Sequence, residues 1–581
     1  MHNPKRSCSK VVTAIAAAAM LPTLLGSEPL ARGAEEDLPL MAPVVVTATR
    51  RAESVATVPA SVTVVSQEQI ARSAAETVPE LLRTVGGVLV SDIAGNGRYF
   101  TVDLSGFGEA APANTLVLID GRRINQVDLS GTDWTLIPLD QVERIEIVRG
   151  SRGSVLYGDN AADGVINIIT KKGKGKQLSA GIAAGSYDTF HSHAGVSGSS
   201  EHFNYALNTN YQESNGYRDN SGTFARNADL NTEYLPTDAF SIALSGGYHE
   251  DEARLPGALT QADFDNGVRR TASLHPNDYA NTRDSYVQAV PQWFFTGSSY
   301  LKLDASFRRR TANSFISFSN GSSLYETTID TTALSPQVVF KEALDGHTSN
   351  LNIGFDYNKS KWKAHNDAVF FPYASTLSAE MTKKTTGSFI HEEFSITDEL
   401  LLSGGARHDR ATFDFPANAS PDKSVFDEDL YTAGITYRIT PKLSAFASYS
   451  KNFRYPLLDE LFDIFTSQFN TGLTSQSGND IEAGTLFQAA GEMTLGLTLF
   501  RTKTENEIFY DSPNFTNANL DGDTIRQGVE VKASKNFSNL LLSASYTFRD
   551  TNIDGGRYDG KEVPDVPKHQ FTVGAATSFF T

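Results

Sequence analysis

The chain contains almost no cysteine. Cys8 is the only one among 581 residues, and it stands before an apolar stretch near the N-terminus. The remainder therefore can form neither disulfide bonds nor thiolate metal centres. If this protein is exported, its stability must come from hydrogen bonding and burial instead.

Long apolar runs and positive charge are also scarce. Beyond the N-terminal region, no apolar run reaches the roughly 18 residues that a transmembrane helix needs, so helical membrane spans are not expected. Only 20% of the residues are charged, and the formal net charge is −18. This acidic balance argues against a nucleic-acid partner.

The first 33 residues have the composition of a secretory signal. Lys5, Arg6 and Lys10 form a basic start, and an apolar stretch follows over 11–25. Small residues at Ala31 and Gly33 favour cleavage near Gly33. We expect 1–33 to be a signal peptide that is removed together with Cys8.

An alternation of apolar and polar side chains recurs from about residue 177 to the end. Met493, Leu495, Leu497 and Leu499 alternate with Thr494, Gly496 and Thr498, and the same pattern occupies 351–357, 433–437 and 542–548. A period of two is that of a β-strand with one apolar face. The region therefore predicts a β-protein of many strands.

The links between these predicted strands alternate in length. Short links are expected at 199–202, 235–238, 396–399, 439–442 and 490–492, and long polar links at about 250–283, 310–330, 360–383, 410–428, 452–480, 504–523 and 550–566. Short turns on one side and long loops on the other are typical of outer-membrane barrels. In such a barrel the leucines of 495–499 face lipid, and Thr494, Gly496 and Thr498 face the lumen. A soluble β-sandwich or propeller is the alternative.

The N-terminal part mixes helical and strand segments and carries a series of short motifs. In order, they are Pro43–Arg50, Val62–Val65, Thr77–Leu82, Asn114–Arg123, Val142–Gly150, Leu156–Gly158 and Gly164–Thr170. This series closely resembles the plug domain of TonB-dependent outer-membrane receptors. The resemblance implies a mixed α/β plug over 49–173, seated inside a transmembrane antiparallel β-barrel over 177–581.

The resemblance also implies a function and a location. These receptors take up a scarce, bulky ligand, either a ferric siderophore or cobalamin, across the outer membrane of a Gram-negative bacterium. The implied partners are the TonB protein, outer-membrane lipid and the ligand. No residue pattern of a catalytic site stands out, so we expect no enzyme. A passive porin-like or adhesin barrel without energy coupling is the alternative function.

The family barrel has 22 strands, whereas about 18 can be counted here. The segments 455–462, 527–530 and 563–569 resemble late-barrel landmarks, and the last of them normally precedes about four more strands. We therefore expect a sequence truncated at its C-terminus, with unpaired edges near 177–187 and 568–580. A smaller closed barrel is the other outcome.

The resemblance assigns two sets of site residues. The TonB box is expected at Pro43, Val44, Val45, Val46, Thr47 and Ala48, after a periplasmic segment over 34–42, because β-branched residues favour the extended state that pairs with a TonB strand. An ion cluster between plug and barrel is expected at Arg149, Glu482 and Glu530. Its second plug arginine is replaced by Ser105, which should leave the cluster partly unfilled.

No metal or cofactor site is expected. His191 and His193 share a strand face but lack a nearby carboxylate, and the acidic residues of 250–283 lack the spacing of a calcium loop. The ligand-binding residues cannot be assigned from the sequence. A signal-transducing receptor of this family needs an extra domain before the TonB box, and only the segment 34–42 is expected there, so that role is disfavoured.

Overall fold

A computed structural model describes residues 44–45, 47–51, 53–92, 95, 97–173, 175–344, 347–416, 419–463, 468–470, 472–489, 493–537 and 539–577. The predicted signal peptide over 1–33 and the segment 34–42 lie outside this range. Among the described residues, no helix is both long and apolar enough to cross a membrane.

A five-stranded sheet forms the centre of the plug, in the order β3-β8-β9-β6-β7. Its strands are β3 (Val62–Val65), β6 (Thr115–Ile119), β7 (Arg122–Arg123), β8 (Val142–Arg149) and β9 (Gly164–Thr170). β6 and β9 are parallel and the other pairs antiparallel. Ile145, Ile147, Ile166 and Ile168 are fully buried in the main plug core. Burial of both sheet faces explains why β9 is largely apolar, whereas β8 also carries the charged residues Arg144, Glu146 and Arg149.

Short helices and strands complete the plug. The helices are α2 (Gln67–Arg72), α3 (Val78–Arg83), α4 (Ala111–Asn114) and α5 (Gly153–Tyr157), with 3₁₀ turns η2 (Val55–Thr57), η3 (Gly108–Ala110), η4 (Trp134–Leu136) and η5 (Leu139–Gln141); the strands are β1 (Val44–Val45), β2 (Glu53–Ser54), β4 (Leu89–Asp92) and β5 (Phe100–Asp103). Ser66 and Gln69 form a capping box at the start of α2. Thr77 caps α3, and Pro79 lies in its first turn, which suits the fixed proline φ.

A single antiparallel sheet of 18 strands follows. Its members are β10 (Gln177–Gly185), β11 (Thr189–Ser199), β12 (Phe203–Ser214), β13 (Thr223–Thr237), β14 (Phe240–Arg254), β15 (Tyr279–Phe294), β16 (Tyr300–Phe318), β17 (Gly321–Leu344), β18 (His347–Phe370), β19 (Tyr373–Ser395), β20 (Leu400–Asp414), β21 (Lys423–Thr440), β22 (Leu443–Arg454), β25 (Gln476–Ala489), β26 (Met493–Glu505), β29 (Asp523–Phe537), β30 (Leu540–Asp554) and β31 (His569–Thr577). The predicted count of about 18 strands is confirmed.

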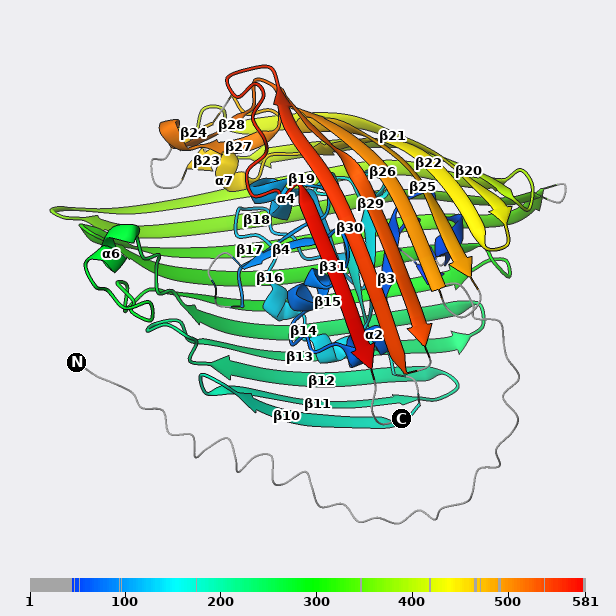
Figure 1. Ribbon diagram of the computed structural model, residues 1–581, viewed down its shortest axis with the longest axis horizontal. Helices are drawn as coiled ribbons and strands as arrows, with labels where there is room; N and C mark the ends of the chain where they lie inside the picture. The colour runs from blue at the N-terminus through cyan, green and yellow to red at the C-terminus, as the bar shows by residue number, and fades with distance from the viewer. Residues whose placement is uncertain are drawn as a thin grey trace, which may run out of the picture. The chain divides into compact units, whose positions relative to one another are not determined.

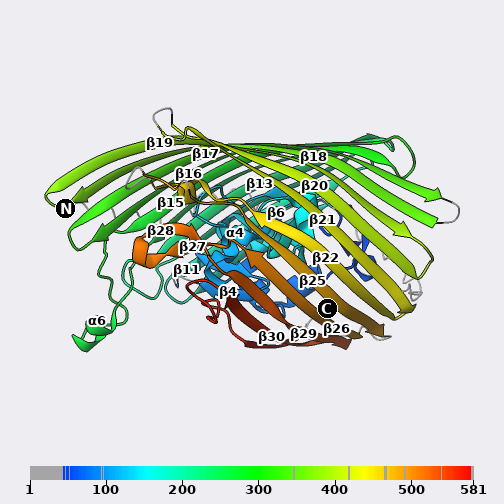
Figure 2. The same ribbon diagram turned by 90° about the horizontal axis from the view of Figure 1, so that it is seen from above.

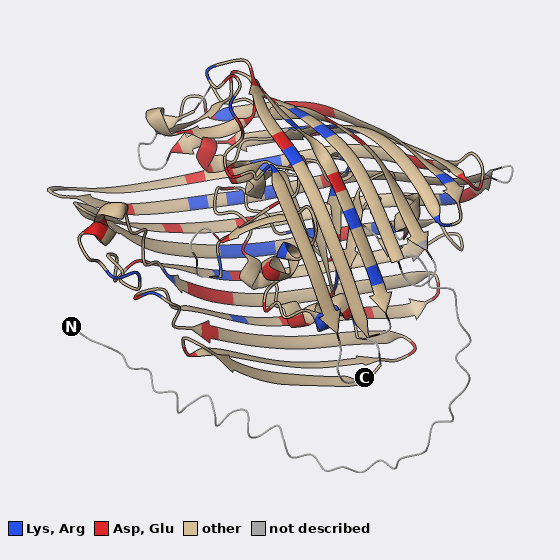
Figure 3. Cartoon of the chain, in the orientation of Figure 1, with Lys and Arg blue, Asp and Glu red and all other residues tan. Residues whose placement is uncertain are grey.

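The sheet curves around the plug, and its strands follow chain order from β10 to β31 (Figures 1 and 2). Each strand pairs with the next one in the sheet, and in the described residues β10 and β31 are not paired with each other. Neither of these two end strands carries a lysine, arginine, aspartate or glutamate (Figure 3).

The polarity of the sheet is inverted relative to a soluble protein. Along β26, Leu495, Leu497 and Leu499 are exposed on the outer face, while Thr498 is buried against the interior. The predicted direction of these side chains is confirmed. Buried polar residues line the inner face of most strands. Apolar outside and polar inside is the pattern of a membrane barrel.

Two of the predicted long links are wrong. Strands β16 and β17 are joined by residues 319–320, and β18 and β19 by residues 371–372, because strand pairing continues through 310–330 and 360–383. Backbone pairing thus extends the alternation into segments with exposed charged residues, such as Lys361 and Glu380, and buried apolar ones, such as Trp362 and Met381. The other long links contain α6 (Gln261–Asp265), α7 (Leu458–Leu461), η6 (Ser512–Asn514), β23 (Phe462–Asp463) paired with β24 (Gln468–Phe469), and β27 (Ile508–Asp511) paired with β28 (Thr516–Asn519).

Candidate functional site

The segment predicted as the TonB box is folded back onto the plug. Pro43 and Val46 lie outside the described residues. Val44 and Val45 form β1, which pairs antiparallel with Glu53 and Ser54 of β2. The Val45 and Ala48 side chains are buried in a small apolar cluster that includes residues 58, 60 and 148. In this state the segment is already paired with a strand of its own chain.

A buried carboxylate holds this segment in place. Thr47 donates two hydrogen bonds to Oε2 of Glu146 in β8, from its backbone nitrogen at 2.9 Å and from its hydroxyl at 2.6 Å. Oε1 of Glu146 accepts from Arg144 at 2.8 Å. Glu146 is fully buried. Thr47 is therefore the point at which the segment is fixed to the central sheet of the plug.

The residues just after this segment join the plug to the inner wall of the sheet. Arg50 forms a bidentate ion pair with Asp356 of β18, at 3.0 and 3.1 Å. Asp356 also pairs with Arg407 of β20 at 2.7 Å. Arg51 contacts Glu393 of β19. Movement of the N-terminal segment away from the plug would therefore disturb ion pairs on three neighbouring strands.

The three residues predicted as an ion cluster lie together. Nε of Arg149 is 3.5 Å from Oε2 of Glu530 in β29, and both side chains are buried. Arg149 also donates to Thr63 at 2.8 Å and to the carbonyl of Gly86 at 2.5 Å. Burial lowers the pKa of Arg149 to about 10, so it remains charged at neutral pH. The cluster thus joins a plug cation to a strand carboxylate.

Glu482 of β25 faces the plug backbone beside this arginine. Its Oε2 accepts from the backbone nitrogen of Ser61 at 3.4 Å. Gly150 has a φ of +67°, and a Cβ there would lie 2.7 Å from Oε1 of Glu482 and 2.6 Å from Oδ2 of Asp480. Only glycine allows both the backbone conformation and this close approach. The Arg149-Gly150 pair therefore places a cation and bare backbone against two strand carboxylates.

Basic side chains from the sheet occupy the gap that was expected at Ser105. Lys532 pairs with Oε1 of Glu530 at 2.6 Å and donates to Thr63 at 3.1 Å. Arg549 of β30 donates to the carbonyls of Gly87 and Leu104 at 3.2 and 3.4 Å. A cavity of only about 10 Å³ remains at the cluster. The strands, rather than the plug, supply the additional positive charge.

Neighbouring plug groups complete this region. The Ser105 hydroxyl donates to the carbonyl of Asp163 at 3.0 Å. Asp103 accepts from four consecutive backbone nitrogens, over residues 105–108. The pKa of Asp163 is raised to about 7 by burial and by the nearby Asp103 carboxylate. The loop that replaces the expected arginine is thus fixed by backbone hydrogen bonds.

Among the described residues, two cavities of several hundred Å³ are bounded by both plug and sheet. The larger, about 830 Å³, runs beside Arg50, Arg123 and Asp159 of the plug and Lys383 and Arg407 of the strands. Its charged side chains are extensively paired: Lys383 is 2.7 Å from Asp159, and Arg407 is 2.6 Å from Asp409. The cavity wall is therefore a network of buried ion pairs.

The smaller cavity, about 320 Å³, lies on the side of the long links. It is bounded by Tyr99 and Ser130 of the plug, Arg310 and Tyr325 of the strands and Asp459 of the link before β25. Asp459 accepts from the backbone nitrogen of residue 129 at 2.9 and 3.0 Å, which folds this link over the plug. Nε of Arg310 has no hydrogen-bond partner in the described part of the chain. No sequence pattern indicates this cavity, because the residues that line it come from distant segments.

Comparison with known proteins identifies the family. Residues 54–165 match the TonB-dependent receptor plug domain, and residues 183–581 match the TonB-dependent receptor-like β-barrel. The chain belongs to the TonB-dependent receptor family. One relative of this receptor, the vitamin B12 transporter BtuB of Vibrio cholerae serotype O1, is 24% identical over 550 residues, which cover 92% of this chain and 82% of the relative.

A second relative is the vitamin B12 transporter BtuB of Photobacterium profundum. It is 34% identical over 221 residues, covering 36% of the receptor described here and 35% of the relative. Among solved structures, the unliganded ferric citrate transporter FecA has a TM-score of 0.78 at 18% identity, covering 90% of this chain and 82% of its own. The ferric yersiniabactin uptake receptor FyuA of Yersinia pestis has a TM-score of 0.75 at 17% identity, covering 88% and 82%. These structural similarities establish the fold.

Proposed function

We propose that this receptor takes up a scarce, bulky ligand across the outer membrane of a Gram-negative bacterium, with the work supplied through the TonB protein. The observation that carries the proposal is the N-terminal segment fixed by Thr47 to Glu146. Val44 and Val45 of this segment are already paired as a strand, which is the main-chain arrangement that strand exchange with a partner requires. A TonB strand could replace β2 as its pairing partner, because main-chain pairing demands little of side chains.

The contacts around this segment suggest how pulling would act. Removing Thr47 from Glu146 breaks two hydrogen bonds to a buried carboxylate, each contributing about 1.5–3 kcal/mol. The pull then reaches Arg50 and its pair with Asp356 in the wall of the larger cavity. Breaking that pair would release Arg50 of the plug from strand β18. We infer that the ligand path opens on this side of the plug.

We propose cobalamin as the first candidate ligand and a ferric siderophore as the second. The names of the sequence relatives favour cobalamin, and the smaller cavity offers a place for part of a ligand against the plug. The Nε of Arg310, which has no hydrogen-bond partner among the described residues, is available to donate to an anionic or amide group of such a ligand. A passive porin-like barrel is disfavoured because plug side chains fill the interior of the sheet.

Direct binding tests the ligand assignment. Purified receptor in detergent is titrated with cyanocobalamin and, separately, with ferric citrate and ferric catecholate or hydroxamate siderophores. We expect saturable binding of cyanocobalamin, weakened about tenfold by Arg310→Gln. Binding of a siderophore but not cobalamin would select the second candidate. A large steady conductance of the wild-type protein in a planar bilayer would instead support the passive channel.

A further inference from the structure

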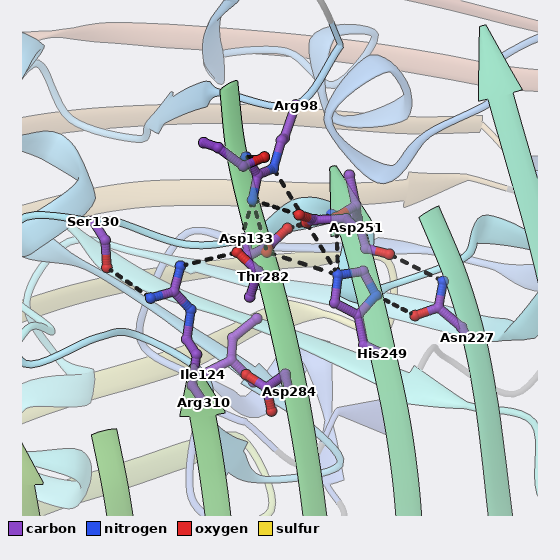
Figure 4. Close-up of polar contacts among 12 residues, drawn as sticks. Arg98, Ile124, Ser130, Asp133, Asn227, His249, Asp251, Thr282, Asp284 and Arg310 are labelled. Carbon is purple, nitrogen blue, oxygen red and sulfur yellow. Dashed lines mark hydrogen bonds and ion pairs between the residues drawn. The ribbon is translucent and has the colours of Figure 1, made fainter. Parts of the chain in front are cut away.

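A histidine and two aspartates meet between plug and sheet, away from both the N-terminal segment and the Arg149 cluster. Asp133 caps η4 of the plug, and His249 and Asp251 project from β14 (Figure 4). Nε2 of His249 lies 3.1 Å from Oδ2 of Asp251 and 3.8 Å from Oδ2 of Asp133. All three residues are more than nine-tenths buried. One ligand atom from each lies within 4.8 Å of the others.

The orientation of His249 is fixed by Asn227 of β13. Nδ2 of Asn227 donates to the carbonyl of Thr135 at 3.2 Å, so Oδ1 faces the imidazole. Nδ1 of His249 lies 2.7 Å from this oxygen and must therefore carry the proton. In the neutral ring, the Nε2 lone pair then points at two carboxylates. A carbonyl that holds the other ring nitrogen in this way is the usual outer partner of a metal-bound histidine.

Asp133 provides an independent observation. Its Oδ1 accepts from Thr135 at 2.6 and 3.1 Å, whereas its buried Oδ2 has no hydrogen-bond partner. A proton on Nε2 of His249 would serve Asp251 but would leave Oδ2 of Asp133 unsatisfied at 3.8 Å. A bound cation would satisfy all three atoms.

Arg98 does not block such a cation. Its guanidinium donates to Oδ1 of Asp251 at 2.6 Å and to Oδ2 at 3.1 Å, and it reaches Oδ2 of Asp133 only at 4.0 Å. Arg98 thus holds Asp251 in position from the outer side. The Thr135 hydroxyl borders the site, 3.3 Å from Nε2 of His249 and 3.0 Å from Oδ2 of Asp251. A bound metal would replace the contact between this hydroxyl and Asp251, and Thr135 would keep its hydrogen bond to Oδ1 of Asp133.

We propose that Asp133, His249 and Asp251 bind one divalent transition-metal ion of the zinc type, which joins the plug to β14. One imidazole nitrogen and two carboxylate oxygens suit such an ion, with water as the fourth ligand. Asp133 comes from the plug and the other two ligands from the sheet, so the ion is a cross-link between the two parts. This site is independent of the proposed transport function.

The chain contains a matched control for this site. His365 and Asp367 of β18 have the same spacing as His249 and Asp251, with Nε2 3.4 Å from Oδ2, but they are exposed and Asp367 is bonded by Thr376. Full-length receptor in detergent is stripped with a chelator, loaded with Zn²⁺, passed through gel filtration and analysed for metal. We expect about one zinc per chain in the wild type and in His365→Gln.

In His249→Gln and Asp133→Asn the affinity for Zn²⁺ should fall at least tenfold. Asn227→Ala, which removes the orienting carbonyl together with the hydrogen bond to the Thr135 carbonyl, should weaken it about tenfold. Zn²⁺ should also raise the thermal transition of the wild type but not that of Asp133→Asn, which separates binding from misfolding. Wild-type protein that retains no zinc, zinc retained equally by His249→Gln, or zinc lost in His365→Gln would overturn the proposal. Wild-type protein that retains no zinc would mean that Nε2 of His249 carries a proton instead of a metal ion.

Discussion

Replacing Arg149 by alanine should weaken the seating of the plug. The substitution removes hydrogen bonds to Thr63 and to the Gly86 carbonyl, at 2.8 and 2.5 Å, and a 3.5 Å contact with Glu530. Glu530 keeps Lys532 at 2.6 Å, but Glu482 loses the charge of Arg149, while the backbone of Ser61 still donates to it at 3.4 Å. Removing one partner from a buried charge set costs about 3–5 kcal/mol.

Urea unfolding in detergent measures this cost. Trp134 is buried in the plug core, so its fluorescence reports plug release, whereas Trp293 and Trp362 lie in strands β15 and β18. With a slope of about 2 kcal/mol/M, a loss of 4 kcal/mol lowers the midpoint by about 2 M. The ligand affinity, extrapolated to zero urea, should change much less than the unfolding midpoint, because Arg149 does not line the cavity beside Arg310.

The double variant Arg149→Met with Glu482→Gln tests whether the carboxylate left behind at Glu482 causes the loss of stability. Neutralising the carboxylate that is left behind should restore about 2 kcal/mol relative to Arg149→Met alone, because a missing buried partner is worse than a missing pair. An unchanged urea midpoint in Arg149→Ala would refute the assignment of Arg149 as a seating residue. A double variant no more stable than the single one would refute the role of Glu482.

Three further results are expected. Because its pKa is raised to about 7, Asp163 contributes plug stability that is full below about pH 4 and is lost as the pH rises through 7. Asp163→Asn should therefore flatten the fall in plug melting temperature over this range. An unchanged slope would show that Asp163 does not cause this pH dependence. Glu146→Ala should speed trypsin cleavage at Arg50 and Arg51 several-fold by freeing Thr47, with Glu68→Ala as a surface control; equal cleavage rates would show that Glu146 does not hold the segment. Leu497→Arg on the outer face should destabilise insertion into lipid vesicles by up to about 2–4 kcal/mol relative to Leu497→Phe; equal insertion would place β26 outside the hydrocarbon.

The strands could be predicted because the alternation of apolar and polar side chains that marks a strand lies within a few consecutive residues. The alternation along 493–499 reports which face each side chain occupies, and the structure agrees. The loops predicted at 310–330 and 360–383 were wrong because backbone pairing continues there although exposed residues such as Lys361, Lys363 and Glu380 are charged. Composition there gives no sign of where a strand ends.

The sites depended on contacts that are distant in sequence. Arg149, Glu482 and Glu530 could be proposed together only through the resemblance to a family. Lys532 stands two residues from Glu530 on the same face of β29, a local signal for an added cation that the sequence analysis overlooked. Nothing in the sequence relates Asp133 to His249, since the pairing of a plug turn with one strand decides that contact.

The most direct test of the account is whether ligand uptake depends on strand pairing by the segment at Val45. Uptake of labelled cyanocobalamin, or of the siderophore that binds, is measured in cells whose own receptor is deleted, with and without TonB. Val45→Pro removes a backbone donor within the segment, whereas Val55→Pro places proline at the first position of η2, where its φ is compatible. We predict uptake in the wild type and Val55→Pro only when TonB is present, and none in Val45→Pro despite normal ligand binding. Equal uptake without TonB, or undiminished uptake by Val45→Pro, would contradict the account.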